Sequence, residues 1–448
     1  MSTTNPIRVL SVCTSDVAGG AARAAFRIHE SVRQEGVDSR MFVKQKGSHD
    51  PNVHALAEYT PQNGFQETMD WVALKIKNKW QHALWRPYRK TMDKNYKSDL
   101  RGTRIYGALQ KWDYDVLHLH WINNRFIKIE DLPTDKPVVW TLHDSWPFCG
   151  VCHYFLDCVG YQQQCGSCPQ LGSHDSNDLS YQIWKKKKSV FDTLDIHIVS
   201  PSRWLADCAA KSSLFAGRDI RVIPNCLDTN VFRPLSQSEV EANLSAAQKQ
   251  NAANHRVLRE VMEKRIAKPF LLFGAMNAAN DRIKGFAILL SALQILDKQG
   301  FEANLMVFGA DETELPMRFE HITVTFLGYV SDTSLLITLY NMADVMVVPS
   351  LTEVFGQTAS ESMACGTPVV AFRCTGIQDV VGKDGGYLVE PYSEEDLARG
   401  IKWVVEHNRN GEMREQVRTN VLERFSIPIV AKMYVELYKE IGKDAKIR

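Results

Sequence analysis

Short apolar runs alternate with longer stretches of helical periodicity along nearly the whole chain. In the first half, apolar runs at residues 7–13, 40–43, 116–120, 138–142 and 196–200 have the length of strands, and residues 19–34 have helical spacing. In the second half, the corresponding runs are residues 270–274, 304–308, 324–327, 344–348 and 368–372. Strands that alternate with helices predict an α/β fold with parallel, doubly wound sheets.

The strand–helix series pauses near Pro224 and Pro234 and then restarts. A chain of 448 residues is also too long for one ordinary core, so we expect two domains. The predicted boundaries are residues 1–222 and 223–426, with a closing surface helix over 427–448. Residues 236–268 are polar and rich in Ala and Glu, which indicates a helical insertion at the start of the second domain.

Composition narrows the class of protein and its compartment. Lys plus Arg number 53 and Asp plus Glu number 52, and this balance argues against a nucleic-acid binder. We find neither a secretory signal nor an apolar run of membrane-spanning length, so the sequence predicts a cytoplasmic protein. In that compartment thiols stay reduced, and the ten cysteines are not expected to form a disulfide framework.

The most informative segment lies at residues 347–366. A buried strand at 344–348 is followed by a loop at 350–356 and a helix at 357–365, which Gly366 and Pro368 terminate. The unpaired N–H groups and positive dipole of a helix N-terminus suit a diphosphate. Glu361 lies one turn into this helix, where its carboxylate can accept both ribose hydroxyls of a nucleotide. The alternative interpretation is a pair of solvated glutamates, Glu353 and Glu361.

This segment closely resembles the signature of family 4 glycosyltransferases, through residues 350–356 (SLTEVFG) and 361–370 (ESMACGTPVV). The likeness continues at 376–381 (GIQDVV) and 386–389 (GYLV). Upstream, residues 224–228 (PNCLD) resemble an interdomain motif of that family, with Cys226 in place of the usual glycine.

The resemblance implies a GT-B fold, in which two Rossmann-like domains face each other across a cleft. It also implies a hexosyltransferase that takes a nucleotide-diphosphate sugar and retains the anomeric configuration, without a cofactor for catalysis. In the donor site, Glu361 would hold the ribose and Glu353 would contact the donor sugar. The remaining donor-binding positions implied by the family are Val354, Phe355, Gly356, Gly19, Gly20 and Tyr329, the last near the base.

Two cations follow the strand at 270–274, within residues 281–285 (DRIKG). Cations ahead of a helix match a departing diphosphate, whose charge grows as the glycosidic bond breaks. The family usually has an arginine directly after the strand, where this chain has Ala275. We therefore take Lys284 as a catalytic residue and Arg282 as the substitute for that arginine. The alternative is a solvated basic turn.

Candidate chemistry in the first half sits at the ends of predicted strands. His143 follows the strand at 138–142, at the edge where ligands of parallel sheets bind. The family has a histidine at this place, so His143 is a candidate near the reacting centre. His118 and His120 point the same way from their strand, either towards the site or packed under loops. The family expectation is front-face substitution, although Asp144 stays open as a nucleophile.

Five cysteines crowd residues 149–168. The two-residue gap between Cys165 and Cys168 is typical of tetrahedral zinc ligation, and Cys152 and Cys158 complete a four-thiolate set. His153 is an alternative ligand, and free thiols are the alternative to a structural zinc. Residues 146–148 and 168–171 also resemble a subgroup of family 4 enzymes from bacterial exopolysaccharide and O-antigen assembly.

Residues 71–111 carry many Lys and Arg residues together with Trp and Tyr. Such a segment indicates either a peripheral contact with the inner face of the membrane or core helices with a solvated basic face. A membrane contact suits a lipid-linked acceptor, and a glycan is the other acceptor class. Two further readings of the chain are a non-catalytic GT-B partner subunit and a nucleotide-sugar-modifying oxidoreductase or epimerase. The first half lacks the G-x-G-x-x-G fingerprint that the latter needs.

Overall fold

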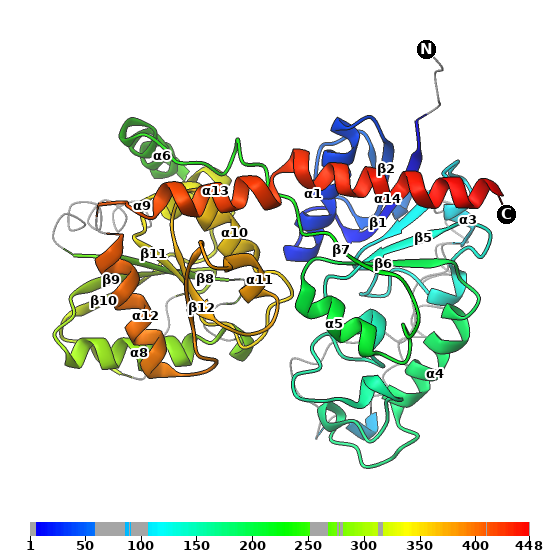
Figure 1. Ribbon diagram of the computed structural model, residues 1–448, viewed down its shortest axis with the longest axis horizontal. Coiled ribbons are helices and arrows are strands. Elements are labelled where there is room, and N and C mark those ends of the chain that lie inside the picture. The colour runs from blue at the N-terminus through cyan, green and yellow to red at the C-terminus, as the bar shows by residue number, and fades with distance from the viewer. Residues whose placement is uncertain are drawn as a thin grey trace. The chain divides into compact units, whose positions relative to one another are not determined.

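The computed structural model describes residues 6–58, 86–88, 90, 106–250, 268–275, 277, 281–311, 317–408 and 410–447. The chain forms two compact units (Figure 1). The first contains the chain up to Ile223 and again from Ala431 onward, and the second contains Pro224–Val430. Each unit is built on its own parallel sheet with helices, so the predicted doubly wound α/β fold is confirmed.

The sheet of the first unit has the strand order β3-β2-β1-β4-β5-β6-β7. Its strands are β1 (Arg8–Ser15), β2 (Asp38–Gln45), β3 (Val53–Ala55), β4 (Val116–Leu119), β5 (Val138–Thr141), β6 (Ile196–Ser200) and β7 (Ile220–Val222). The sequence patterns missed β3 and β7, because three residues are too few to show a period.

Helices of the first unit are α1 (Gly20–Gln34), α3 (Tyr106–Leu109), α4 (Leu179–Phe191) and α5 (Arg203–Lys211). Short 3-10 helices are η1 (Leu56–Glu58), η2 (Arg86–Tyr88), η3 (Ile129–Asp131), η4 (Trp146–Phe148), η5 (Gly160–Gln162) and η6 (Pro169–Leu171). The last helix, α14 (Ile427–Ile447), starts in the second unit and joins the first from Ala431. Its Tyr434 and Tyr438 are fully buried, so it contributes to the core as well as to the surface.

The sheet of the second unit has the strand order β10-β9-β8-β11-β12-β13. Its strands are β8 (Phe270–Gly274), β9 (Ala303–Phe308), β10 (Ile322–Phe326), β11 (Val345–Val348), β12 (Val369–Phe372) and β13 (Gly386–Val389). Its helices are α6 (Gln237–Gln250), η7 (Arg282–Lys284), α8 (Phe286–Lys298), α9 (Thr333–Met342), α10 (Gln357–Ala364), α11 (Ile377–Val381), α12 (Glu394–His407) and α13 (Arg414–Phe425).

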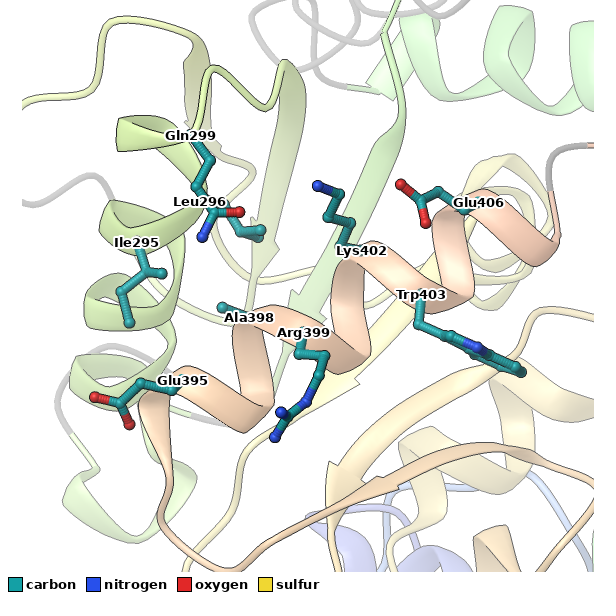
Figure 2. Close-up of a pocket in the computed structure, with 9 residues that line it drawn as sticks. All are labelled: Ile295, Leu296, Gln299, Glu395, Ala398, Arg399, Lys402, Trp403 and Glu406. Atoms are coloured by element: carbon teal, nitrogen blue, oxygen red, sulfur yellow. The ribbon is translucent and has the colours of Figure 1, made fainter.

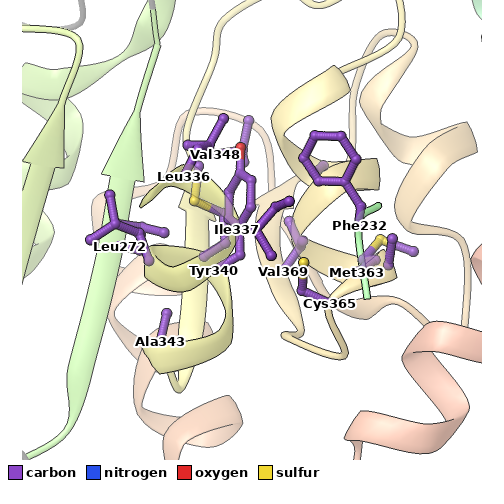
Figure 3. Packing of buried hydrophobic residues seen from close by; sticks show 14 of the residues in the cluster. Phe232, Leu272, Leu336, Ile337, Tyr340, Ala343, Val348, Met363, Cys365 and Val369 are labelled. Atoms are coloured by element: carbon purple, nitrogen blue, oxygen red, sulfur yellow. The ribbon is translucent and has the colours of Figure 1, made fainter. Parts of the chain in front are cut away.

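Both faces of this second sheet are covered, which explains why its strands read as continuous apolar runs. Alternate residues of β8 enter different cores: Leu272 packs with α9 and α10, whereas Phe273 packs with α8 and α12. Figure 3 shows Leu272 with Tyr340 of α9 and Met363 of α10 in the first of these cores.

Several predicted segments fall outside the described residues. Of the basic, aromatic segment 71–111, only residues 86–88, 90 and 106–111 are described, and of the predicted insertion 236–268 only its beginning, which includes α6, and residue 268. Among the helices that are described, none has both the length and the apolar character needed to cross a membrane.

Candidate functional site

In each sheet there is one place where the strand order reverses. In the second unit it lies between β8 and β11, because the chain runs outward from β8 to β10 and then from β11 to β13 on the other side. In the first unit it lies between β1 and β4. Loops that leave neighbouring strands in opposite directions open a crevice, which is where doubly wound sheets bind ligands. The loops after β8, β11, β1 and β4 are therefore the places to look for a site.

Lys284 and Glu353 meet at the reversal point of the second unit. Lys284 ends η7 after β8, and Glu353 lies in the loop after β11. The Lys284 Nζ atom is 2.7 Å from Glu353 Oε1, and both side chains are less than a fifth exposed. Ser350 donates to the same carboxylate oxygen at 3.1 Å. The structure thus joins two residues that the sequence suggested separately for one site.

A glycine lets these two loops pass closely. Gly285 has a φ of 72°, and a Cβ atom there would lie 1.8 Å from the carbonyl oxygen of Pro349. The backbone N–H of Leu351 donates to the carbonyl of Ile283 at 2.8 Å, which ties the loops together beside the ion pair. Only glycine fits this crossing, so the position of Lys284 depends on Gly285.

The helix α10 begins at an open N-terminus in the loop after β11. Its N-cap, Gly356, has a φ of 96° and makes no side-chain cap. An added Cβ would lie 2.4 Å from Ile377 Cδ1, so the turn requires glycine. A helix start without a side-chain cap leaves backbone N–H groups for an anion. This is the geometry expected for a diphosphate site.

Glu361 lies one turn into α10 and is buried. The hydroxyl of Tyr340, on α9, donates to Glu361 Oε2 at 3.1 Å. Tyr340 is itself fully buried, and the carbonyl of the same residue accepts from Thr367 Oγ1 at 2.6 Å. Sequence analysis missed Tyr340, because a tyrosine in an apolar helix looks like an ordinary core residue. In the structure, the Tyr340 hydroxyl orients the carboxylate of Glu361, the residue predicted to bind the ribose.

The other predicted donor-site residues differ in what they offer. Phe355 is buried and packs edge-on against Phe425 of α13, with 5.3 Å between ring centroids, so its side chain belongs to the core. Val354 is half-buried in the same loop, Arg282 is exposed on the turn of Lys284, and Tyr329 is 65% exposed after β10. Only the backbone groups of Phe355 are left for the donor-binding role predicted from the sequence.

At the reversal point of the first unit, Gly19 caps α1 with a φ of 94°, again without a side-chain cap. Gly20 is the first residue of the helix and is exposed. The nearby Asp16 is buried and accepts from the backbone N–H groups of Gly47 and Ser48, which fixes the loop. The Gly19–Gly20 turn thus begins the helix without a side-chain cap, next to a loop that Asp16 holds in place.

His143 follows β5 and is bound to a second histidine after β4. His143 Nε2 and His120 Nδ1 are 3.0 Å apart. Burial lowers the pKa of His143 to about 4 and that of His118 to about 3. Both imidazoles are therefore neutral near pH 7, and His143 is not a resident cation. The sequence left the packing of His118 and His120 open, and the structure buries both.

Asp144 is an anchor for the following loop. It accepts from the Trp146 backbone N–H at 2.9 Å, from Trp121 Nε1 at 2.8 Å and from His153 Nδ1 at 2.6 Å. Burial alone would raise the pKa of Asp144, but these donors outweigh it and the pKa is lowered. Both carboxylate oxygens accept hydrogen bonds, which gives Asp144 a structural role in holding this loop.

The cysteine-rich loop differs from the predicted four-thiolate geometry. In the described part of the chain, which includes all five of these cysteines, no three His, Cys, Asp or Glu side chains are placed to hold a metal ion. Cys152 and Cys168 hydrogen-bond to each other, whereas Cys165 Sγ accepts from the Gly150 N–H at 3.1 Å and Cys158 is only half-buried. The predicted set of Cys152, Cys158, Cys165 and Cys168 is thus not assembled.

A buried lysine organises this loop instead. The Lys187 ammonium, on α4, donates to the carbonyls of Cys149 at 2.8 Å and Gly150 at 2.9 Å, and also to that of Trp146. It lies 3.6 Å from the centroid of the Trp146 ring. Burial lowers the pKa of Lys187 to about 7, while three carbonyl acceptors favour the charged form. Sequence analysis missed Lys187, because it lies in a run of four consecutive lysines.

A separate surface pocket of about 440 Å³ lies between α8 and α12 (Figure 2). Its lining includes the apolar Leu296 and Trp403 and the charged Arg399, Lys402 and Glu406. None of the predicted site residues lines it. The pocket therefore plays no part in the site described above.

Two Rossmann-like units, each built on a parallel sheet with one reversal point, match the GT-B fold of glycosyltransferases. The chain matches the family "Glycosyltransferase Family 4" over residues 18–231 and "Glycosyl transferases group 1" over residues 252–424. It belongs to family 4 of the glycosyltransferases, and it is an enzyme of the transferase class.

Relatives agree with this assignment. The chain is 24% identical to the "Putative colanic acid biosynthesis glycosyl transferase WcaC" of Escherichia coli K12, over 86% of this chain and 87% of WcaC. It is 27% identical to the D-inositol 3-phosphate glycosyltransferase of Corynebacterium jeikeium, over 73% of each chain.

Solved structures support the fold. Sucrose-phosphate synthase of Thermosynechococcus elongatus superposes with a TM-score of 0.59 at 20% identity, covering 98% of this chain and all of that one. Anabaena HepE, solved in complex with UDP and glucose, gives a TM-score of 0.59 at 16% identity, covering 97% of this chain and all of HepE.

Proposed function

We propose that the protein transfers a sugar from a nucleotide-diphosphate sugar to a glycan or lipid-linked acceptor in bacterial cell-surface polysaccharide assembly, with retention of configuration. The contact between Lys284 and Glu353, at the reversal point of the second sheet, is the main support for the proposed donor site. It gathers a cation, a carboxylate and the open start of α10 around one crevice, as a charged donor requires.

In this proposal the second unit holds the donor. Glu361 accepts the ribose hydroxyls, with Tyr340 fixing one carboxylate oxygen. The diphosphate lies at the N-terminus of α10, where Gly356 provides no side-chain cap and the helix dipole favours an anion. Lys284, with Arg282 on the same turn, neutralises the charge that develops on the leaving diphosphate. Glu353 contacts the donor sugar, and the exposed Tyr329 lies beside the base. HepE, which shares the fold, is solved with UDP and glucose, and this supports a nucleotide-sugar donor.

In the first unit, the residues proposed to act in the reaction are Gly19, Gly20 and His143. Retention by double displacement needs a carboxylate nucleophile beside the anomeric carbon. Asp144 accepts three hydrogen bonds that hold it against the following loop, a structural role that favours front-face substitution. In that mechanism the leaving diphosphate accepts the acceptor's proton, and the protein positions both substrates.

The pathway rests on similarity to WcaC, whose name refers to colanic acid biosynthesis. A lipid-linked acceptor would bring the enzyme to the inner face of the membrane, with residues 71–111 as the contact. The two alternatives, a non-catalytic partner subunit and an oxidoreductase or epimerase, predict different outcomes in one experiment.

The experiment is calorimetric titration of the full chain with UDP-glucose, UDP-galactose, UDP-N-acetylglucosamine, GDP-mannose and GDP-fucose. A donor that binds wild type and is lost in Glu361→Ala supports the donor site. Turnover of that donor, with NMR showing that the transferred sugar keeps its anomeric configuration, supports retention. Binding without any transfer indicates a partner subunit, and conversion of the donor into a different nucleotide sugar indicates an oxidoreductase or epimerase. An inverted product contradicts the mechanism.

A further inference from the structure

His143 contacts a pair of buried histidines, His120 and His118, and His118 in turn contacts Tyr438 of the last helix. His118 and His120 lie on one side of the β4 segment, with ring centroids 4.1 Å apart. Tyr438 of α14 and His118 Nδ1 are 2.7 Å apart, and His118 Nε2 is 2.8 Å from Thr141 Oγ1. The same threonine hydroxyl is 3.1 Å from the Tyr434 hydroxyl. Both nitrogens of His118 are therefore held, and His120 packs against a fixed ring.

His120 differs from His118 in having only one bonded nitrogen. Its Nδ1 faces His143 Nε2 at 3.0 Å, and its Nε2 is buried without a hydrogen-bond partner in the described part of the chain. His120 as a whole is only 2% exposed. Trp140 Nε1 donates to the His120 carbonyl at 3.1 Å, so the backbone is fixed as well.

This asymmetry decides where the protons sit. Burial lowers the pKa of both His120 and His143, so each ring carries one proton at neutral pH, and the bond between them needs one donor and one acceptor. If His143 Nε2 carried the proton, the proton of His120 would be on Nε2, as a buried N–H with no acceptor. Orphaned buried N–H groups are rarer than unpaired acceptors, so the proton of His120 belongs on Nδ1.

We propose that His120 is a positioning residue of the transfer reaction, which donates from Nδ1 to Nε2 of His143 and holds His143 in its Nδ1-protonated tautomer. His118, Thr141 and Tyr438 hold His120 in turn, so a residue of the last helix supports a residue of the site. The functional part of this inference rests on the proposed function, because it needs His143 to act in the reaction. The tautomer does not depend on it.

The first test reads the tautomer directly in the full chain without any ligand. Protein labelled with ¹⁵N-histidine is measured by long-range ¹H–¹⁵N correlation, and His143 is assigned by its loss in His143→Gln. We expect one tautomer, with a proton on Nδ1 and none on Nε2. A proton on Nε2, or fast averaging of the two forms, overturns the proposal whatever the enzyme's activity is.

The second test compares His120→Asn with His120→Gln. The Asn amide reaches the place of Nδ1 and can still donate to His143, whereas the Gln amide reaches the place of Nε2 and cannot. With the nucleotide sugar that wild type turns over, we expect Asn to retain most of kcat and Gln to lose roughly tenfold, with KM for the donor nearly unchanged. The Gln variant should also lose the single His143 tautomer.

Equal kcat values for the two variants, or a Gln variant with the wild-type tautomer, contradict the positioning role. Tyr438→Phe serves as an independent variant should His120→Gln not fold, because it removes only the hydroxyl that meets His118. In this variant, His143 should populate both tautomers instead of one. An unchanged spectrum would contradict the proposal that Tyr438 helps to hold His120 through His118. If wild-type protein shows the expected tautomer of His143 but has no transferase activity, the tautomer assignment stands. The proposed transferase function is then refuted.

Discussion

Lys284 Nζ lies 2.7 Å from Glu353 Oε1, and the two side chains come from loops that leave β8 and β11 on opposite sides of the point where the strand order reverses. Each residue neutralises the other in this state. In the proposed function, a diphosphate bound at α10 would compete with Glu353 for the ammonium, and Glu353 would then be available to sugar hydroxyls. The pair keeps both groups at the site without leaving a half-buried charge unpaired.

Replacing Lys284 by alanine should reduce turnover more than donor affinity. The diphosphate charge peaks in the transition state, so the lost stabilisation appears mainly in kcat, by about 100-fold. Steady-state kinetics with the donor found in the panel measure this. A matched control is Lys268→Ala, because Lys268 pairs with Glu302 at 3.5 Å on the surface near the start of β8. An equal loss in kcat and affinity, or none, removes Lys284 from the mechanism.

Tyr340→Phe should weaken donor binding about tenfold while leaving the fold intact. The substitution removes only the hydroxyl that orients Glu361, and a hydrogen bond to a carboxylate contributes about 1.5–3 kcal/mol. Calorimetry on the full chain measures the affinity. Tyr387→Phe is the control, since Tyr387 packs against Trp403 in the other core of that unit. Matching affinities for the two variants would exclude the role given to Tyr340.

Acid should destabilise the first unit. Burial lowers the pKa of His118 to about 3 and of His29 and His143 to about 4, from about 6.5 when exposed. Below pH 6.5 the unfolded chain binds protons that the folded unit does not. The free energy of unfolding therefore has its full histidine contribution above pH 6.5 and decreases towards pH 4. Urea unfolding followed by tryptophan fluorescence reports this unit, because every tryptophan except Trp403 belongs to it.

The sum over three histidines amounts to several kcal/mol between pH 6.5 and 4. His118→Asn should flatten the pH dependence, because one of the depressed groups is gone. A midpoint that stays constant from pH 7 to 4.5, or one that rises on acidification, contradicts the neutral burial of this cluster.

Lys187→Met should destabilise the first unit by about 3 kcal/mol, because three buried carbonyls lose their common donor. The neighbouring Lys188→Met is the matched control. Lys188 pairs with Asp192 on the surface of α4, and its loss should cost less than about 0.5 kcal/mol. Thermal unfolding compares the two, and similar melting temperatures would show that the Lys187 ammonium does not hold the loop.

Metal analysis tests whether zinc stabilises the cysteine-rich loop. With Lys187 holding the loop, EDTA should leave the melting temperature unchanged. One zinc per chain that is lost in Cys168→Ser would instead restore the four-thiolate prediction and require the loop to rearrange around the metal.

Much of the fold could be predicted from local patterns. Strand positions such as 270–274 and 344–348 followed from continuous apolar runs, because strands covered on both faces need nothing else. The loop and helix around Glu353 and Glu361 followed from the glycine and proline positions that end them. Short strands such as β7, and the partners of buried polar groups, gave no periodic signal.

The sequence by itself determined the α/β class, the division near Pro224 and the resemblance that points to Glu353, Glu361 and Lys284, because these depend on residue types at short spacing. Only the tertiary structure decided which distant groups meet: Tyr340 with Glu361, Lys187 with the loop carbonyls, and Tyr438 with His118 across more than 300 residues of chain. Among the described residues it also brings no three of the loop cysteines together in an arrangement that could hold a metal ion. Contacts of this kind depend on how strands are ordered in a sheet and which helix returns to it, and no local pattern encodes either.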